Sequence, residues 1–151
     1  MDLFAGSSSD SFGKSLGYLA FSGKQKDWRM WNAKFQAYAL TKGCKDVLLG
    51  RERVPPHDKI LEVGTIVGST TNEDGDLVAV LLTAAEAKKK SFARKANDHI
   101  YGSLVQLSED MTFFSAVEKA KTEKLPDGDA HQAWLNLIDR YAPTLITSEV
   151  D

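Results

Sequence analysis

The sequence predicts an all-α fold, a small bundle of about four long helices plus one short helix. Apolar residues recur at intervals of three and four along most of the chain, which is the period of helices that bury one face. Capping residues, glycines and prolines stand where these stripes would have to begin or end. The chain has 151 residues, of which 42% are hydrophobic and 26% charged, so it is long enough for one globular domain with its own core.

The first long helix is predicted over about residues 27–42. Its apolar stripe consists of Trp28, Trp31, Phe35, Tyr38 and Ala39. Asp27 suits the first turn, where a carboxylate interacts with the free amides and the helix dipole, and Gly43 suits the position after the last turn. A buried aromatic side chain covers roughly 150–250 Å². We therefore expect the two tryptophans to fasten this helix to the core, with Trp134 as a partner.

The middle of the chain has two parts. A short turn of helix is predicted within residues 44–50, and Pro55 and Pro56 prevent its continuation. Residues 59–82 then place aliphatic runs on both sides of the turn-like segment TTNEDGD. Two interpretations of this region stay open, a hairpin or a loop with a short helical start.

Three further helices are predicted in the second half, over about residues 83–107, 111–123 and 129–142. The apolar stripes of the first and last of these helices include Ala96, Ile100, Leu104, Trp134, Leu137 and Tyr141. Asp129 and Gln132 have the spacing of a capping box, and Pro143 marks the end of the last helix.

The predicted domain organisation has three parts. Residues 1–20, rich in serine and glycine, form a flexible N-terminal lead-in, residues 21–145 form the helical domain, and residues 146–151 form a tail. Cys44 is the single cysteine, so no internal disulfide can form, and a reducing, cytoplasmic location is expected. No apolar run approaches the ~20 residues of a membrane span, so no membrane partner is expected.

Charge is unevenly distributed, although the net charge is only −2. Residues 24–53 hold eight Lys/Arg and three Asp/Glu, which gives a net charge of +5. Residues 108–129 hold three Lys/Arg and six Asp/Glu, which gives a net charge of −3. Either the surface is simply solvated, or basic and acidic faces meet across a head-to-tail contact between copies. The candidate electrostatic contacts are Lys24, Lys26, Arg29, Lys88, Lys89 and Lys90. The last three spread over about 200° of a helix and form no compact patch.

Motifs for catalysis and cofactor binding fail on spacing. Gly13-Lys14-Ser15 resembles the end of a phosphate-binding loop, but Ser8 stands where that loop needs its first glycine. The segment TTNEDGD resembles a calcium loop, but Thr70 and Leu81 occupy its first and twelfth ligand positions. The three histidines and one cysteine lack the spacing of a zinc site. We therefore expect that this protein is not an enzyme and that it binds no cofactor, no metal and no small-molecule substrate.

Three blocks of residues, in this order and spacing, resemble a known family. Phe21 and Gly23 precede the aromatic helix, and Val47-x-x-Gly50 follows it. Ala96, Ile100 and Leu104 form an alanine–aliphatic helix, and the third block reads Ala130-x-x-Ala133-Trp134-x-x-Leu137-x-x-x-Tyr141. Together the blocks cover about residues 18–145. They are similar to the N-terminal capsid-like region of the Gag polyproteins of copia-type LTR retrotransposons.

The resemblance implies a fold like that of a capsid N-terminal domain and a structural function. Such a Gag segment self-assembles into a virus-like particle that packages the RNA of the transposable element. The implied partner is the chain itself, associating weakly as an isolated segment, and RNA binds through the full-length protein. A second helical half would follow residues 146–151. Residues 57–82 are longer and more aliphatic than the usual linker of the family.

Two alternative functions remain open from the sequence. The first is a nucleic-acid-binding helical module, in which an exposed tryptophan stacks on bases and residues 24–53 and 88–95 supply the basic surface. The second is a host adaptor domain derived from such a Gag protein. The exposure of the tryptophans distinguishes base stacking from core packing.

Overall fold

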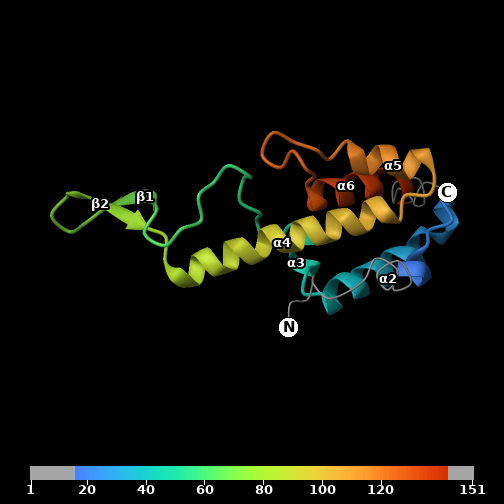
Figure 1. Cartoon of the computed structure of the whole chain (residues 1–151), viewed down its shortest axis with the longest axis horizontal. Helices are drawn as coiled ribbons and strands as arrows, with labels where there is room; N and C mark the ends of the chain where they lie inside the picture. The colour runs from blue at the N-terminus through green and yellow to red at the C-terminus, as the bar shows by residue number, and fades with distance from the viewer. Residues whose placement is uncertain (1–15, 143–151) are drawn as a thin grey trace, which may run out of the picture.

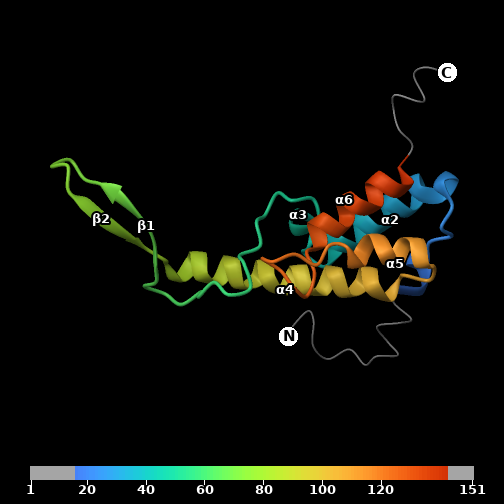
Figure 2. The same ribbon diagram turned by 90° about the horizontal axis from the view of Figure 1, so that it is seen from above.

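The structure, a computed structural model, describes residues 16–142. The elements in chain order are η1 (Gly17–Leu19), η2 (Gln25–Asp27), α2 (Trp28–Thr41), α3 (Lys45–Leu48), β1 (Ile66–Thr71), β2 (Leu77–Leu81), α4 (Ala84–Gln106), α5 (Met111–Glu118) and α6 (Ala130–Tyr141). The two views in Figures 1 and 2 show an elongated molecule. Most helices gather at one end, and the two strands project at the other end, beyond the start of α4.

The helical body consists of residues 16–54 and 91–142, and the hairpin arm consists of residues 64–82. The body contains four longer helices and the short α3, in the predicted order. The fold is therefore mostly helical, as predicted.

The all-α prediction is wrong in one region, because β1 and β2 pair as an antiparallel two-stranded sheet. Ile66 pairs with Leu81 and Thr71 with Leu77, and a bulge lies between residues 66 and 68. Most residues in these runs are β-branched or aliphatic, which favours extended backbone. Of the two interpretations left open for residues 59–82, the hairpin is the one in the structure.

A tight turn closes the hairpin. The Asn72 side-chain oxygen accepts hydrogen bonds from the amides of Asp74 and Asp76, at 3.0 and 2.9 Å. Gly75 takes a φ of +83°, a left-handed conformation that glycine adopts without strain. At the other end of the hairpin, the Gly64 amide donates to the Leu82 carbonyl at 2.8 Å. The segment that resembled a calcium loop is thus a strand-joining turn.

The core of the body is an aromatic cluster drawn from both ends of the chain. Trp28, Trp31 and Trp134 are 2%, 3% and 1% exposed, and Phe35 is fully buried. The ring centroids of Trp28 and Trp134 are 5.7 Å apart, and those of Phe35 and Trp134 are 5.5 Å apart. These are the separations of favourable aromatic pairs. Helices α2 and α6 therefore pack together, as expected from the helical stripes.

The packed body begins earlier in the chain than the predicted boundary at residue 20. Leu16 and Leu19 are buried in the core, and the Trp31 indole N–H donates to the Leu19 carbonyl at 2.5 Å. The end of the predicted lead-in is thus part of the domain, because it supplies an acceptor to a buried donor. Residues 1–15, with the phosphate-loop-like segment, and the tail at residues 146–151 lie outside the described residues.

Helix α5 ends at Glu118, five residues before its predicted end. The Ala120 carbonyl accepts a hydrogen bond from the Asp129 amide at 2.9 Å, and the Thr122 amide donates to the Leu125 carbonyl at 3.2 Å. These backbone groups would be needed for a further helical turn. The returning loop uses them instead, so the helix stops.

Helix α4 belongs to both parts of the molecule. Thr83 caps it, with its hydroxyl accepting from the Glu86 amide at 3.2 Å. In its second half Ala93, Ala96 and Ile100 are fully buried against the body. In its first turns, up to residue 90, Ala87 is the one buried residue. The helix thus carries the arm away from the body (Figure 2).

Candidate interaction surface

The residues that carry the family resemblance lie in the core. Ten of them are buried: Phe21, Trp28, Trp31, Phe35, Ala96, Ile100, Leu104, Trp134, Leu137 and Tyr141. Gly23 is partly exposed, with a φ of +80°. It lies beside Asp110, and a Cβ at this position would come within 2.6 Å of the Asp110 carboxylate. The structure therefore brings these residues together as packing groups rather than as a site that a ligand could enter.

Base stacking by a tryptophan is incompatible with this arrangement. All three tryptophans are at most 3% exposed, whereas a stacking platform must present the face of its ring to solvent. The expectation of an exposed tryptophan, which belonged to the nucleic-acid-binding alternative, is wrong for this chain. The physical reason is the helical spacing of Trp28 and Trp31, which directs both rings into the same core.

Among residues 16–142, one cluster resembles a catalytic arrangement, and in it Tyr38 and Ser103 are buried and His99 is partly buried. The Tyr38 hydroxyl lies 2.9 Å from His99 Nε2 and 3.3 Å from the Ser103 hydroxyl, which itself donates to the His99 carbonyl at 2.9 Å. Burial lowers the pKa of His99 and raises the pKa of Tyr38. Ser103 is fully buried, so a substrate cannot reach its hydroxyl. The cluster joins α2 to α4 through neutral hydrogen bonds.

The single cysteine is also unsuited to chemistry. Cys44 is fully buried, and burial raises its pKa to about 11, against a smaller opposing effect of Lys42. The thiol therefore stays protonated at neutral pH, whereas nucleophilic or metal-binding cysteines act as thiolates. Within residues 16–142, no three histidine, cysteine or acidic side chains are grouped so that they could hold a metal ion. No helix in that range is long and apolar enough to cross a membrane.

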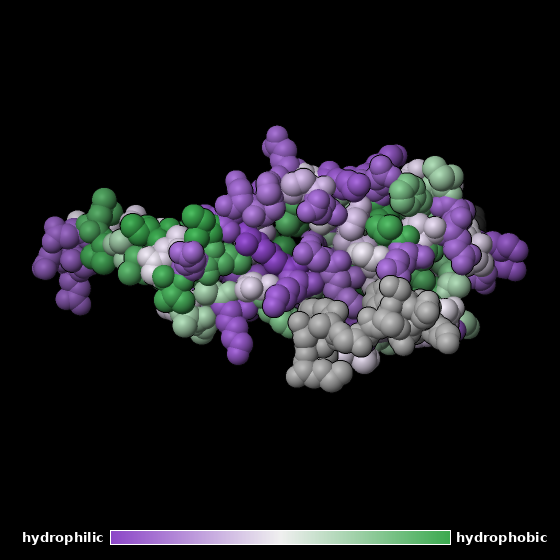
Figure 3. Space-filling model, viewed as in Figure 1, coloured by the Kyte–Doolittle hydropathy of each residue, from purple (hydrophilic) through white to green (hydrophobic). Residues whose placement is uncertain are grey.

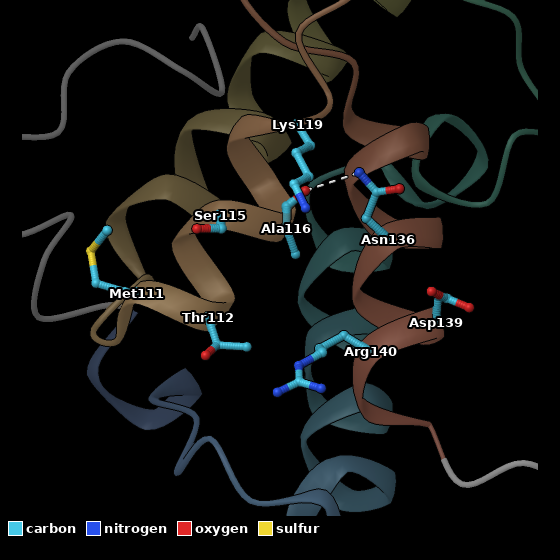
Figure 4. A pocket seen from close by; sticks show the side chains of 8 residues that line it. All are labelled: Met111, Thr112, Ser115, Ala116, Lys119, Asn136, Asp139 and Arg140. Carbon is cyan, nitrogen blue, oxygen red and sulfur yellow. Dashed lines mark hydrogen bonds between the residues drawn. The ribbon is translucent and has the colours of Figure 1, made fainter.

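A hollow of about 470 Å³ lies between α5 and α6 (Figure 4). Lys119, Asp139 and Arg140, the charged side chains that line it, are exposed. Asn136 spans the two helices, donating to the Ala116 carbonyl at 2.9 Å. The hollow is thus bordered by a structural hydrogen bond between its two helices and by exposed charged side chains. None of these charged groups is held in a buried environment that would tune it for catalysis.

The hairpin arm is the unusual surface of the molecule. Every residue of β1 and β2 is exposed. Leu77 is 78% exposed, Ile66 66% and Leu81 50%. Apolar residues dominate the arm in Figure 3, with hydrophilic residues at its outer tip. A two-stranded hairpin without a partner is marginally stable in water, and large apolar patches on soluble proteins usually mark interaction sites.

Sequence reasoning missed the arm as a functional candidate. Its aliphatic runs predict burial on composition alone, because apolar side chains are most often found inside. The available signal was Asp74-Gly75 between two runs rich in β-branched residues, which is typical of a hairpin. That signal predicts strands, but it does not predict that they project from the body.

The arm has two faces, because successive strand residues point to opposite sides. The leucine face carries Ile66, Leu77 and Leu81. The valine face carries Val78 and Val80, and continues to Leu82 at the base of the arm. The three carboxylates of the turn, Glu73, Asp74 and Asp76, are the only charged side chains within the arm, giving it a net charge of −3.

The base of the arm contains a second hollow, also about 470 Å³, which is called the arm hollow below. Its apolar lining includes Val54, Pro55, Pro56, Ile60, Leu61, Val67 and Leu82. Four cations also line it and form its basic rim, namely Arg53, Lys59, Lys90 and Lys124, against one anion, Glu86. The arm hollow therefore combines an apolar floor with a net charge of +3 from its lining residues.

Hydrogen bonds hold the walls of the arm hollow in place. The Arg94 guanidinium donates to the carbonyls of Pro56 and Lys59, the latter at 2.7 Å. The His57 amide donates to the Lys124 carbonyl at 2.8 Å. These contacts tie the segment before the arm to α4 and to the loop before α6. The hollow is thus pre-formed, which lowers the entropic cost of binding.

The predicted electrostatic contacts lie on two separate surfaces. Lys24, Lys26 and Arg29 are exposed around the start of α2. Lys88, Lys89 and Lys90 are exposed on the first half of α4. Lys89 lies 3.6 Å from Glu52, and Lys90 belongs to the basic rim. The structure does not bring the two groups together into one patch.

Comparison of the chain with models of protein families, with curated proteins and with solved structures returned no match.

Proposed function

We propose that this chain is a structural segment of a copia-type retrotransposon Gag polyprotein, a non-enzymatic capsid-like domain that self-associates. In the full-length protein it would contribute to a virus-like shell around the RNA of the element, in the cytoplasm. The resemblance of the three sequence blocks supports the family. The observation that carries self-association is the hairpin arm, in which every strand residue is exposed and most of the exposed side chains are apolar.

Two further features support a structural rather than a catalytic role. The polar cluster of Tyr38, His99 and Ser103 is built into the packing of α2 on α4. The Cys44 thiol is protonated and inaccessible. Weak contacts are sufficient for a shell, because a lattice repeats each contact many times. A host adaptor domain derived from Gag would use the same exposed surface toward a different partner.

Sedimentation velocity over a concentration series tests self-association. The isolated chain should be a monomer with a weak, reversible oligomer at micromolar concentrations. Exposed ion pairs contribute only ~0–1 kcal/mol each and are screened by salt, so the electrostatic part of the association should weaken above physiological ionic strength. A chain that sediments as a monomer at every concentration, and whose sedimenting mass increases only when RNA is added, would instead support the nucleic-acid-binding alternative.

A charge-reversal variant tests the basic surface of α2. Changing Lys24, Lys26 and Arg29 together to glutamate should reduce self-association without unfolding the domain, because these side chains are exposed and lie outside the buried stripe. The matched control changes the same three residues to glutamine and should give an intermediate effect. Equal, salt-independent association of all three proteins would exclude an electrostatic contact at this surface.

A further inference from the structure

We propose that the hairpin arm is a homodimerisation device, in which the arms of two copies pack antiparallel, valine face to valine face, with the acidic turn of each over the arm hollow of the other. This inference rests on the proposed function, since it names the partner and the contact through which the chain self-associates. Three features support it: a continuous apolar strip, opposite charges at the two ends of that strip, and a contact of suitable size.

The valine face and the arm hollow form one continuous apolar strip. Val78 and Val80 lie on the same side of β2, and Leu82, which directly follows β2 and is only 1% exposed, forms the base of this side and lines the hollow. Val67 of β1 joins them there. Val78, Val80 and Val67 are 43%, 40% and 39% exposed. The strip therefore runs from the turn of the hairpin to its base without a charged side chain from the strands.

The ends of the strip carry opposite charges. The turn contributes Glu73, Asp74 and Asp76, and the basic rim contributes four cations against Glu86. When two such strips are placed face to face and antiparallel, the acidic end of each meets the basic end of the other. A two-fold contact of this kind is self-complementary, which is the commonest arrangement in homo-oligomers. A second copy of this chain therefore matches the strip in both apolarity and charge.

The size of the strip fits a weak and reversible dimer. Ile60, beside the strip, is 61% exposed, and together with the three valines it offers roughly 200–300 Å² of apolar surface per copy. With polar rim and backbone atoms included, the total contact falls near or below the ~1,200 Å² at which specific protein interfaces begin. Packing would also convert each marginal hairpin into half of a two-layer sheet, which removes the instability of an isolated two-stranded ribbon.

The test compares arm variants of the full 151-residue chain by sedimentation equilibrium from low micromolar to several hundred micromolar. Val78→Thr with Val80→Thr keeps β-branched residues in the strand but makes the valine face polar, and should raise the dimer dissociation constant at least about tenfold. The matched control, Leu77→Thr with Leu81→Thr, changes the opposite face. It should leave the dimer dissociation constant within about twofold of the wild-type value. The arm contains no tryptophan, so unchanged tryptophan emission verifies that the body is folded in both variants.

A charge swap tests the antiparallel arrangement. Glu73→Lys with Asp74→Lys, and separately Lys59→Glu with Lys90→Glu, should each weaken the dimer. The protein with all four changes should recover it, because each copy then again presents opposite charges at the two ends of its strip. Failure of the fourfold variant to recover would overturn the antiparallel arrangement.

The outcomes separate this inference from the proposed function. If the leucine-face variant weakens the dimer and the valine-face variant does not, the assigned face is wrong. If neither variant affects a chain that still self-associates, the arm is not the interface, and self-association through another surface stands. A wild-type chain that stays monomeric at every concentration would overturn both proposals.

Discussion

The helical body and the hairpin arm use similar apolar side chains with opposite results. In the body, Trp31, Phe35 and Leu137 are at most 3% exposed. In the arm, Leu77 and Ile66 are 78% and 66% exposed. The difference does not come from hydrophobicity, because the arm is richer in aliphatic residues than most of the helices. It comes from the availability of a facing surface.

The body provides such a surface because its helices fold back on one another. Helices α2 and α6, from opposite ends of the chain, place aromatic rings within 6 Å of each other. No helix or strand within residues 16–142 covers β1 and β2, because the first turns of α4 carry the arm away from the body. A folded region without a facing surface leaves its apolar side chains exposed, whereas the apolar stripes of the body bury one another. The predictions below test this division.

Removing the central aromatic residue of the body should have the largest effect. Trp134→Ala should lower the free energy of unfolding by about 3–5 kcal/mol, since it empties a fully packed site. The control is Leu135→Ala on the same helix, where the side chain is 43% exposed, and it should cost well under ~1 kcal/mol. Urea unfolding followed by circular dichroism measures both. Equal costs for the two variants would contradict the core assigned to α6.

A smaller effect is expected where one buried polar side chain ties a loop to the body. Asn97 is 1% exposed, donates to the Gly128 carbonyl at 2.9 Å and accepts from the Ala130 amide at 2.8 Å. Asn97→Ala leaves both backbone groups without this partner and should cost about 1–3 kcal/mol. The control is Lys95→Ala, two residues earlier on α4, where the side chain is exposed, and it should be nearly neutral. Faster hydrogen exchange at the Ala130 amide should accompany the loss of stability in the first variant alone.

The body should also lose stability as the pH falls below neutrality. Burial, with a smaller contribution from Lys42, lowers the pKa of His99 in the folded state. The unfolded chain, with an ordinary histidine pKa near ~6.5, then binds more protons than the folded chain, so the free energy of unfolding decreases as the pH drops from about 7 toward the folded pKa. His99→Gln should flatten this dependence in unfolding experiments between pH 7.5 and 5. An unchanged slope in the variant would assign the effect to another group.

Changes in the arm should have the smallest effect on the stability of the monomer. Leu77→Ala removes a side chain that is 78% exposed, so the free energy of unfolding of the body at low concentration should change by less than ~0.5 kcal/mol. Amides of β1 and β2 should exchange with solvent much faster than those of α6, because the arm opens without unfolding the body. Protection of the arm equal to that of α6 in the monomer would mean that the two parts form one cooperative unit.

Local patterns in the sequence were sufficient to predict the order of the helices and their buried faces. The spacing of Trp28, Trp31 and Phe35 predicts which face of α2 is buried without knowledge of the structure, because this prediction depends only on the helical period. The capping signal at Asp129 likewise predicted the start of α6, where its side chain accepts from the Gln132 amide at 3.2 Å. These features depend on residues within one or two turns of each other.

Only the tertiary structure decided the features that depend on distant partners. Residues 59–82 were compatible with a strand or a helical start, and pairing of β1 with β2 selected the strand. Helix α5 stops because Asp129, from the other end of a loop, binds the Ala120 carbonyl. Leu16 and Leu19 join the core because Trp31 lies within reach of the Leu19 carbonyl.

The exposure of the arm is the clearest case of a tertiary decision. An aliphatic run predicts that its side chains are buried. The sequence does not determine whether the surface that covers them belongs to the same chain. That depends on the direction in which α4 leaves the body, which is set by the packing of Ala93, Ala96 and Ile100 far from the strands themselves. Apolarity is a property of each residue, whereas burial is a property of the surfaces that the whole fold places opposite it.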